Sequence, residues 1–140
     1  MTVTLKFQTR HFTKLWVSIM KHDKEINHKA VESTTVKGEL VKSMAEKKIA
    51  DFLHSYNIKY DYERVIYLDK IKFVPDFYLK QFGVFVEYWG LTDFKKYRNR
   101  MKKKKRMYRK HNLKLISLYP EDVNKLNEDF FDKLKSLIDK

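Results

Sequence analysis

The sequence predicts an α/β domain in which a mixed sheet carries helices on both faces, with the element order α-β-β-β-α-β-α. Three runs alternate aromatic or β-branched residues with polar ones, which is the period of a strand: residues 60–68, 73–79 and 84–89. Three stretches repeat apolar residues three and four positions apart, which is the period of one helix face: residues 41–56, 94–108 and 123–138. A compact apolar strand at residues 113–119 follows the second helix, so it should pair in parallel with the strand before that helix.

Composition narrows the class of protein. The 140 residues suit one domain with a modest core, and 43% hydrophobic with 15% aromatic residues indicate a folded chain. The chain has no cysteine, which excludes disulfides, zinc-thiolate sites and thiol catalysis. No apolar run approaches the roughly 20 residues that span a bilayer, so we expect a soluble, intracellular (cytoplasmic) protein that needs no membrane. The net charge of +13 favours a polyanionic partner, and nucleic acid more than an acidic membrane.

Residues 1–40 are predicted to form an N-terminal extension to a main domain at residues 41–140. Thr2–Phe7 alternates like a short strand, and Phe12–Met20 has the apolar stripe of an amphipathic helix. That stripe is expected to pack on the core, and a dimer contact is the alternative. Residues 34–38 have the composition of a loop that leads into the main domain.

The first helix of the main domain should begin at Ser43 and end near Asn57. Ser43 followed three residues later by Glu46 matches a capping box, in which the two side chains satisfy free backbone N–H groups. Glu46 also falls at the edge of the apolar stripe, where an acid can point along the sheet beneath. Taken alone, Glu46 is best explained by capping.

The second and third strands place two acids opposite each other. If residues 80–83 form the hairpin loop, Leu79 pairs with Val84 and the same register sets Asp76 against Glu87. Opposed side chains on one sheet face have Cβ atoms roughly 5 Å apart, and like charges there repel. A divalent cation between them would remove this repulsion. The alternative is that Asp76 marks a Pro-Asp strand entry and Glu87 is an unrelated exposed acid.

Two neighbouring features bear on this hairpin. Pro75 cannot donate to a sheet ladder, so it should lie at an edge or a bulge. Glu63, on the preceding strand, is a candidate ligand for a metal or a water, although an ordinary exposed strand position explains it as well. A turn is predicted at Asp69 and Lys70.

The basic helix places one lysine on its apolar face. Phe94, Tyr97, Met101 and Tyr108 form a stripe at i, i+3, i+7 and i+14, and the i+10 position is Lys104. A buried ammonium needs a carboxylate or a phosphate beside it, and a snorkelling lysine at the core edge is the alternative. The other basic residues can bind DNA phosphates, or form only a solvated face. They are Lys95, Lys96, Arg98, Arg100, Lys102, Lys103, Lys105, Arg106, Arg109 and Lys110.

The last helix should begin at Pro120. Its buried face is predicted to contain Val123, Leu126, Phe130, Leu134, Leu137 and Ile138.

The ordered set Glu46, Pro75-Asp76, Glu87-Tyr-Trp-Gly90, Tyr97, Lys104 and Tyr108 resembles the PD-(D/E)xK nuclease superfamily, across roughly residues 38–122. Within it, the set is similar to a subgroup found alone or attached to superfamily-1 helicases. The resemblance implies a restriction-endonuclease-like fold and Mg²⁺-dependent hydrolysis of DNA phosphodiester bonds, with Mn²⁺ as a substitute.

In this resemblance Asp76, Glu87 and the Tyr88 carbonyl would bind the ion, and Glu46 would bind the same ion, a second ion or a water. Trp89 stands where the superfamily motif has its lysine, two residues after the second acid. The resembling subgroup supplies that lysine from the following helix, which corresponds to Lys104. Tyr97 and Tyr108 match aromatic positions of the same helix, and with Glu63 and Trp89 they form a second tier of candidate residues.

The leading hypothesis from the sequence is therefore a DNA endonuclease, directed by DNA structure or by a repair, recombination or helicase partner. The first alternative is a catalytically degraded module of the same fold that binds DNA or a helicase. A domain that binds RNA is a more distant alternative. Two-fold pairing would allow two sites to cut both strands.

Overall fold

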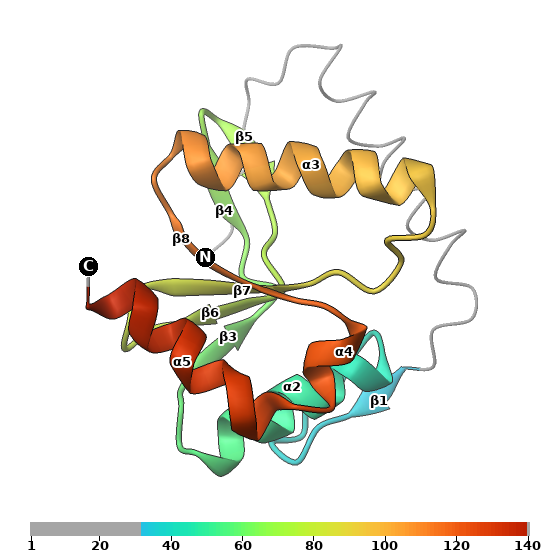
Figure 1. Cartoon of the computed structure of the whole chain (residues 1–140), viewed down its shortest axis with the longest axis vertical. Helices are drawn as coiled ribbons and strands as arrows, with labels where there is room; N and C mark the ends of the chain where they lie inside the picture. The colour runs from blue at the N-terminus through green and yellow to red at the C-terminus, as the bar shows by residue number, and fades with distance from the viewer. Residues whose placement is uncertain (1–31, 140) are drawn as a thin grey trace.

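The computed structural model describes residues 32–139. Its centre is a four-stranded mixed sheet in the order β3-β6-β7-β8 (Figure 1). The strands are β3 (Tyr60–Tyr62), β6 (Phe77–Leu79), β7 (Val84–Tyr88) and β8 (Lys114–Leu118). β7 pairs with β8 in parallel, and the other two pairings are antiparallel. The parallel pairing confirms the predicted crossover through the basic helix.

Helices cover both faces of the sheet, as predicted. α2 (Met44–Ser55), α4 (Pro120–Val123) and α5 (Leu126–Ile138) lie on one face, and α3 (Lys95–Lys110) crosses the other (Figure 1). None of the described helices is long and apolar enough to cross a membrane.

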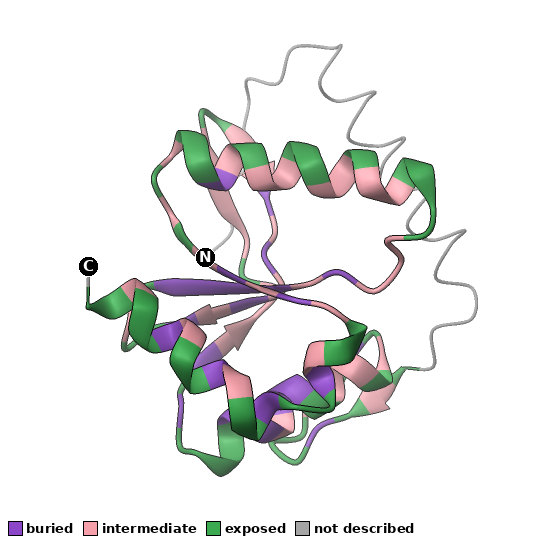
Figure 2. Ribbon diagram, viewed as in Figure 1, coloured by how far each residue is buried: buried purple, intermediate pink, exposed green. Residues whose placement is uncertain are grey.

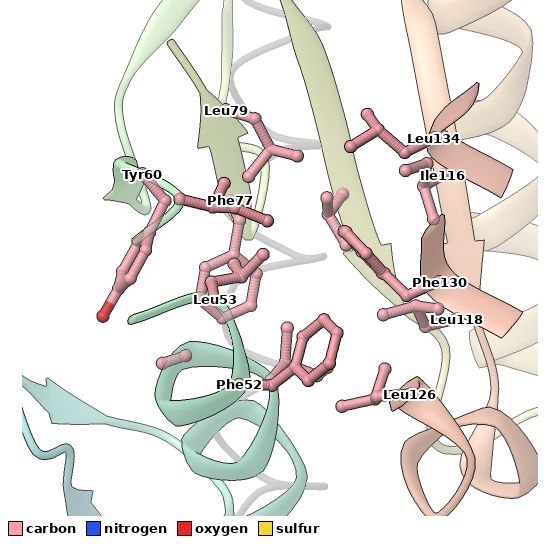
Figure 3. Close-up of a cluster of buried hydrophobic side chains, with 14 of the residues drawn as sticks. Phe52, Leu53, Tyr60, Phe77, Leu79, Ile116, Leu118, Leu126, Phe130 and Leu134 are labelled. Atoms are coloured by element: carbon pink, nitrogen blue, oxygen red, sulfur yellow. The ribbon is translucent and has the colours of Figure 1, made fainter. Parts of the chain in front are cut away.

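The main core lies between the sheet and the layer of α2 and α5. Leu53 of α2 lies against Phe77 of β6, and the ring of Phe52 packs edge-on against Phe130 of α5 (Figure 3). The buried residues of α2 and α5, purple in Figure 2, belong to this core. A second, smaller cluster under α3 contains Phe73, Phe85 and Tyr108.

Two predicted strands are each divided in the structure. Residues 60–68 form β3 and β4 (Ile66–Leu68), because Glu63 adopts a left-handed backbone with φ of 49° and ends the first strand. Residues 73–79 contain the end of β5 (Ile71–Phe73) and then β6, with Pro75 between them and outside both ladders. β4 and β5 form a separate two-stranded sheet, and its turn is at Asp69 and Lys70, as predicted.

The beginning of the described chain forms a hairpin. β1 (Ser33–Thr34) pairs with β2 (Leu40–Val41), so the predicted loop at 34–38 supplies the turn between them, with Gly38 at a φ of 94°. This hairpin spans the boundary that the sequence predicts at residue 40. The predicted strand at residues 2–7 and helix at residues 12–20 lie outside the described residues.

The ends of two helices differ from the prediction. The helix predicted from Pro120 onward is two helices, because the chain turns at Asn124 and Lys125 between α4 and α5. Ile138, predicted to be buried, is 40% exposed in the last turn of α5. Phe94, predicted on the apolar stripe of α3, is 57% exposed because it precedes the first turn as the N-cap residue.

Ser43 caps α2 as predicted. Its hydroxyl accepts a hydrogen bond from the Glu46 N–H at 3.1 Å, and the residue itself has an extended backbone. Ser43→Ala should lower the free energy of unfolding in urea by about 1 kcal/mol, because the N–H loses its acceptor. Ser136→Ala, on the exposed side of α5, is the control and should change it by less than about 0.5 kcal/mol. An equal loss in both variants would contradict the capping role.

Candidate active site

Glu46 projects from the first turn of α2 toward the end of the sheet. Its Oε2 accepts hydrogen bonds from the Tyr62 hydroxyl at 2.6 Å and from the Lys42 N–H at 3.1 Å. Glu46 therefore reaches a backbone N–H one residue before the cap, rather than that of Ser43. The carboxylate is thus held between the start of the helix and strand β3.

The hairpin register is the one predicted. Leu79 pairs with Val84 and Phe77 with Val86, so the next pair in the same antiparallel register is Asp76 with Glu87. Asp76 is fixed by a hydrogen bond of 2.7 Å from the Tyr88 N–H to its Oδ2. Glu87 lies on the central strand and is only 1% exposed. The two acids of the hairpin therefore lie at the same end of the sheet.

Lys104 reaches this end of the sheet from α3. Its Nζ lies 2.7 Å from Oε1 and 2.8 Å from Oε2 of Glu87, and it donates to the Val74 carbonyl at 2.8 Å. The prediction that this lysine faces the protein and meets a carboxylate is confirmed. The three acceptors match the three N–H groups of an ammonium. Lys104 is therefore anchored by both the second acid and the segment that leads into the first.

Tyr108 completes the surroundings of Glu87. Its hydroxyl donates to Glu87 Oε1 at 2.6 Å, and its ring packs edge-on against Phe73. The Glu87 carboxylate thus accepts from a phenol and an ammonium within a buried environment. Such charge-assisted hydrogen bonds offset part of the cost of burying the acid.

The charge of Asp76 acts on the two glutamates of the site. Burial, and then the negative charge of Asp76, raises the pKa of Glu87 to about 8, against the opposing effect of Lys104. Burial and the charge of Asp76 likewise raise the pKa of Glu46 to about 7. Burial lowers the pKa of Lys104, but the charges of Glu87 and Asp76 outweigh it and raise that pKa overall. Crowded acids with raised pKa values and a cationic neighbour are typical of functional sites.

Trp89 and Tyr97 border the acids. Trp89, at the motif position of the lysine, is 3% exposed and packs beside the ammonium groups of Lys104 and Lys105, 6.0 and 5.5 Å from its ring. The Tyr97 hydroxyl donates to the Tyr88 carbonyl at 3.3 Å. The carbonyl predicted as a metal ligand is thus held by Tyr97.

Glu63 has a different environment. Its carboxylate forms an ion pair with Lys42, and the residue directly follows the last residue of β3. Its charge adds to the rise in the pKa of Glu46. The structure therefore places Glu63 near the acids, paired with a lysine.

Most of the predicted DNA-binding residues lie on the outer side of α3. The exposed ones are Lys95, Lys96, Lys102, Lys103, Arg106, Arg109 and Lys110. Three others turn inward: Arg98 donates to the Thr92 carbonyl, Arg100 stacks on Tyr97, and Lys105 donates to the Tyr119 hydroxyl at 2.6 Å. Seven cations thus lie on one exposed helix face, and one of them, Lys110, is paired with Asp69 at 2.6 Å.

The sequence did not identify every partner in the cluster. Tyr62, the Val74 carbonyl and Lys42 each bind a candidate residue. The only sequence signal of Tyr62 was its place in the alternating strand at residues 60–68. The backbone atoms of Val74 and Lys42 gave no sequence signal.

A divalent ion fits the chemistry of this cluster. Within residues 32–139 no three His, Asp or Glu side chains already converge as a metal-binding group. The charge of Asp76 nevertheless raises the pKa of both Glu46 and Glu87 through repulsion, and carboxylate oxygens are the ligands that Mg²⁺ prefers. A cation near Asp76 would remove this repulsion.

Comparison with known proteins adds little on function. No family model matches the chain, and no solved structure matches it. The uncharacterized protein MJ1519 of Methanocaldococcus jannaschii is 34% identical over 87 residues. The match covers 60% of this chain but only 7% of that protein, so the similar segment lies within a far longer polypeptide.

Proposed function

We propose that this chain is a Mg²⁺-dependent DNA endonuclease with the restriction-endonuclease-like arrangement of the PD-(D/E)xK superfamily. The observation that carries the proposal is the contact of Lys104 with both oxygens of Glu87. The sequence departs from the superfamily motif at Trp89, and α3 brings another lysine to the second acid. We propose that Lys104 serves as the relocated lysine that the resemblance implies.

Asp76, Glu87, the Tyr88 carbonyl and Glu46 would hold the ion. When bound, Mg²⁺ would lower the pKa of a water and stabilise negative charge on a DNA phosphate. The residues of the chain would prepare the site for it: Tyr62 orients Glu46, and the Tyr88 N–H orients Asp76. Lys104 places a positive charge beside the acids, where charge develops on the phosphate during hydrolysis.

The exposed face of α3 supports DNA as the substrate. Six of its seven cations form no ion pair with a described residue and offer phosphate contacts, which give salt-dependent affinity with little sequence preference. The described part of the chain is small, so we propose that DNA structure or a partner such as a helicase or repair protein directs cleavage. The position of the similar segment inside a long Methanocaldococcus jannaschii protein supports direction by an attached partner.

A cleavage assay with Mg²⁺ and with EDTA tests the proposal. The wild-type protein should cut DNA in Mg²⁺ and leave it intact in EDTA. Asp76→Ala should cut at least about 10²-fold more slowly, because it removes a charged group at the reacting centre. A variant that cuts as fast as wild type would show that the site is assigned wrongly.

A catalytically degraded module is the second candidate. Lys104 and Tyr108 already occupy the Glu87 carboxylate, and no acidic triad is assembled among residues 32–139. In this case the wild-type protein would bind DNA, or a helicase, but would not cut DNA whichever divalent ion is supplied. The assay above therefore separates the two candidates.

A further inference from the structure

A groove runs along the free edge of the sheet, on the far side of β8 from β7. Its volume is about 540 Å³, and residues of α3, β8 and α5 line it. In Figure 1, β8 passes between α3 and α5. The groove is separate from the acids, although Tyr108 reaches both.

The floor of the groove is an unpaired strand edge. β8 ends the sheet order, and no described strand pairs with it on this side. The Trp89 N–H donates to the Leu118 carbonyl at 2.8 Å, which directs the backbone of Leu118 toward β7. Backbone groups alternate in direction along a strand, so those of Leu115 and Ser117 point into the groove. The Ser117 carbonyl accepts from Lys133 at 3.4 Å, which leaves the Leu115 amide and carbonyl and the Ser117 N–H for an incoming chain.

This edge differs from the opposite edge of the sheet. β3 has three residues, and its central Asp61 is paired with Arg64 and Lys80. Short, charged edges of this kind resist pairing with another strand. β8 has five residues and carries Leu115, Ile116 and Leu118, so it is the better template for a further strand.

The walls of the groove select the charge of that strand. Lys105 and Arg109 of α3 and Lys114 of β8 contribute three positive charges, and the lining contains no acidic residue. Arg109 and Lys114 form no ion pair with any described residue. Leu137 of α5 adds an apolar wall. A second copy of this chain would bring Lys114 and its neighbours against the same cations, which would be repulsive.

We infer that the β8 edge groove binds an acidic, extended peptide segment of a partner protein as a fifth strand of the sheet. The backbone of the segment would pair with Leu115 and Ser117, as in other cases of strand addition. Acidic side chains on one face would lie near Lys105 and Arg109, and apolar side chains on the other would lie near Leu137. A single-stranded nucleic acid would use the cations but not the amide groups of the edge or Leu137, so a peptide satisfies more of the groove.

The test uses the full chain and a short fluorescein-labelled peptide that alternates glutamate with valine. Fluorescence anisotropy should show saturable binding. The same peptide with N-methylated valines keeps its charge but loses the backbone N–H groups of its valines. It should bind at least about fivefold more weakly. Amide hydrogen exchange at Leu115 and Ser117 should slow when the unmodified peptide binds. These readouts need no metal and no cleavage, so they stand or fall independently of the nuclease proposal.

Charge reversal tests the walls of the groove. Lys114→Glu should weaken peptide binding about fivefold. Lys135→Glu, an equal charge change on the exposed side of α5 and outside the groove, should change it by less than about twofold. Ser117→Pro removes the N–H of Ser117 from the edge and should also weaken peptide binding. If this variant does not fold, the hydrogen exchange of the Ser117 amide in the wild-type protein tests the same contact.

Three results would overturn the inference. Equal weakening by Lys114→Glu and Lys135→Glu would show general attraction between charges. Displacement of the peptide by oligo-dT, with protection of Leu115 and Ser117 by the oligonucleotide itself, would assign the groove to nucleic acid. A dimer in sedimentation that Ser117→Pro dissociates would assign it to a second copy of the chain.

Discussion

Lys104→Met should reduce DNA cleavage in Mg²⁺ by about 10²- to 10³-fold, the loss that follows removal of one group that stabilises charge in the transition state. Methionine retains much of the length and volume of the stem but cannot bind Glu87 or the Val74 carbonyl. Affinity for DNA should change little, because the seven exposed cations of α3 remain. Single-turnover cleavage and anisotropy measured on the same DNA duplex separate the two effects.

Lys103→Met is the matched control. Lys103 precedes Lys104 in the same helix and is exposed, so its loss should weaken DNA binding slightly and leave the rate at saturating protein unchanged. If the two variants cut equally fast at saturation, Lys104 does not take the role of the motif lysine, whose position in this chain is occupied by Trp89.

The stability of Lys104→Met should depend on pH in a defined direction. The pKa of Glu87 is raised from 4.5 to about 8 although Lys104 lowers it, so without Lys104 the folded-state pKa should rise further. A raised folded-state pKa contributes stability that is complete below the unfolded pKa and is lost as the pH rises through the folded pKa. Above about pH 8 the variant should therefore lose stability relative to wild type, by up to about 1.4 kcal/mol per pH unit. Urea unfolding between about pH 6 and about pH 10 measures this difference.

Asp76→Asn should abolish metal binding without destabilising the metal-free protein. Asparagine can still accept the Tyr88 N–H, but it removes the charge that raises the pKa of both Glu46 and Glu87. In EDTA the variant should be equally stable or more stable by about 1 kcal/mol, a common result when a strained functional site is relieved. Mn²⁺ should raise the Tm of the wild-type protein, because it binds only the folded state, and should not raise that of the variant.

Asp61→Asn controls for the loss of an acid elsewhere. Asp61 pairs with Arg64 and Lys80 and makes no contact with the three acids, so its variant should keep the full increase in Tm with Mn²⁺. An increase that persists in Asp76→Asn would place the metal at other residues.

Local pattern was enough to predict the parts of the site that depend on one hairpin or one helix. The pairing of Leu79 with Val84 determined the opposition of Asp76 and Glu87, because a hairpin register extends along both strands. Helical periodicity alone identified Lys104 as the inward lysine of α3. The contact with Glu87 then followed from the position of α3 directly after β7.

The breaks in the strands and the backbone partners were not predictable in the same way. The alternation of apolar and polar residues continues in the sequence through Glu63 and Pro75. This pattern indicates which face of a sheet a side chain would occupy, but it does not indicate the φ angle of the residue. The structure ends the strands there and folds β4 and β5 as a separate pair. Val74 lies in one of these breaks, and its carbonyl accepts from Lys104 across the fold. Contacts between segments so far apart in sequence arise only when the tertiary packing is complete.

The most direct test of the proposed site is a crystal structure soaked with Mn²⁺ and examined for anomalous density. The account predicts a peak between Asp76 and Glu87, with Lys104 still beside the site. Saturating Mn²⁺ that supports DNA cleavage but gives no peak at these two acids, or a peak at other residues, would contradict it.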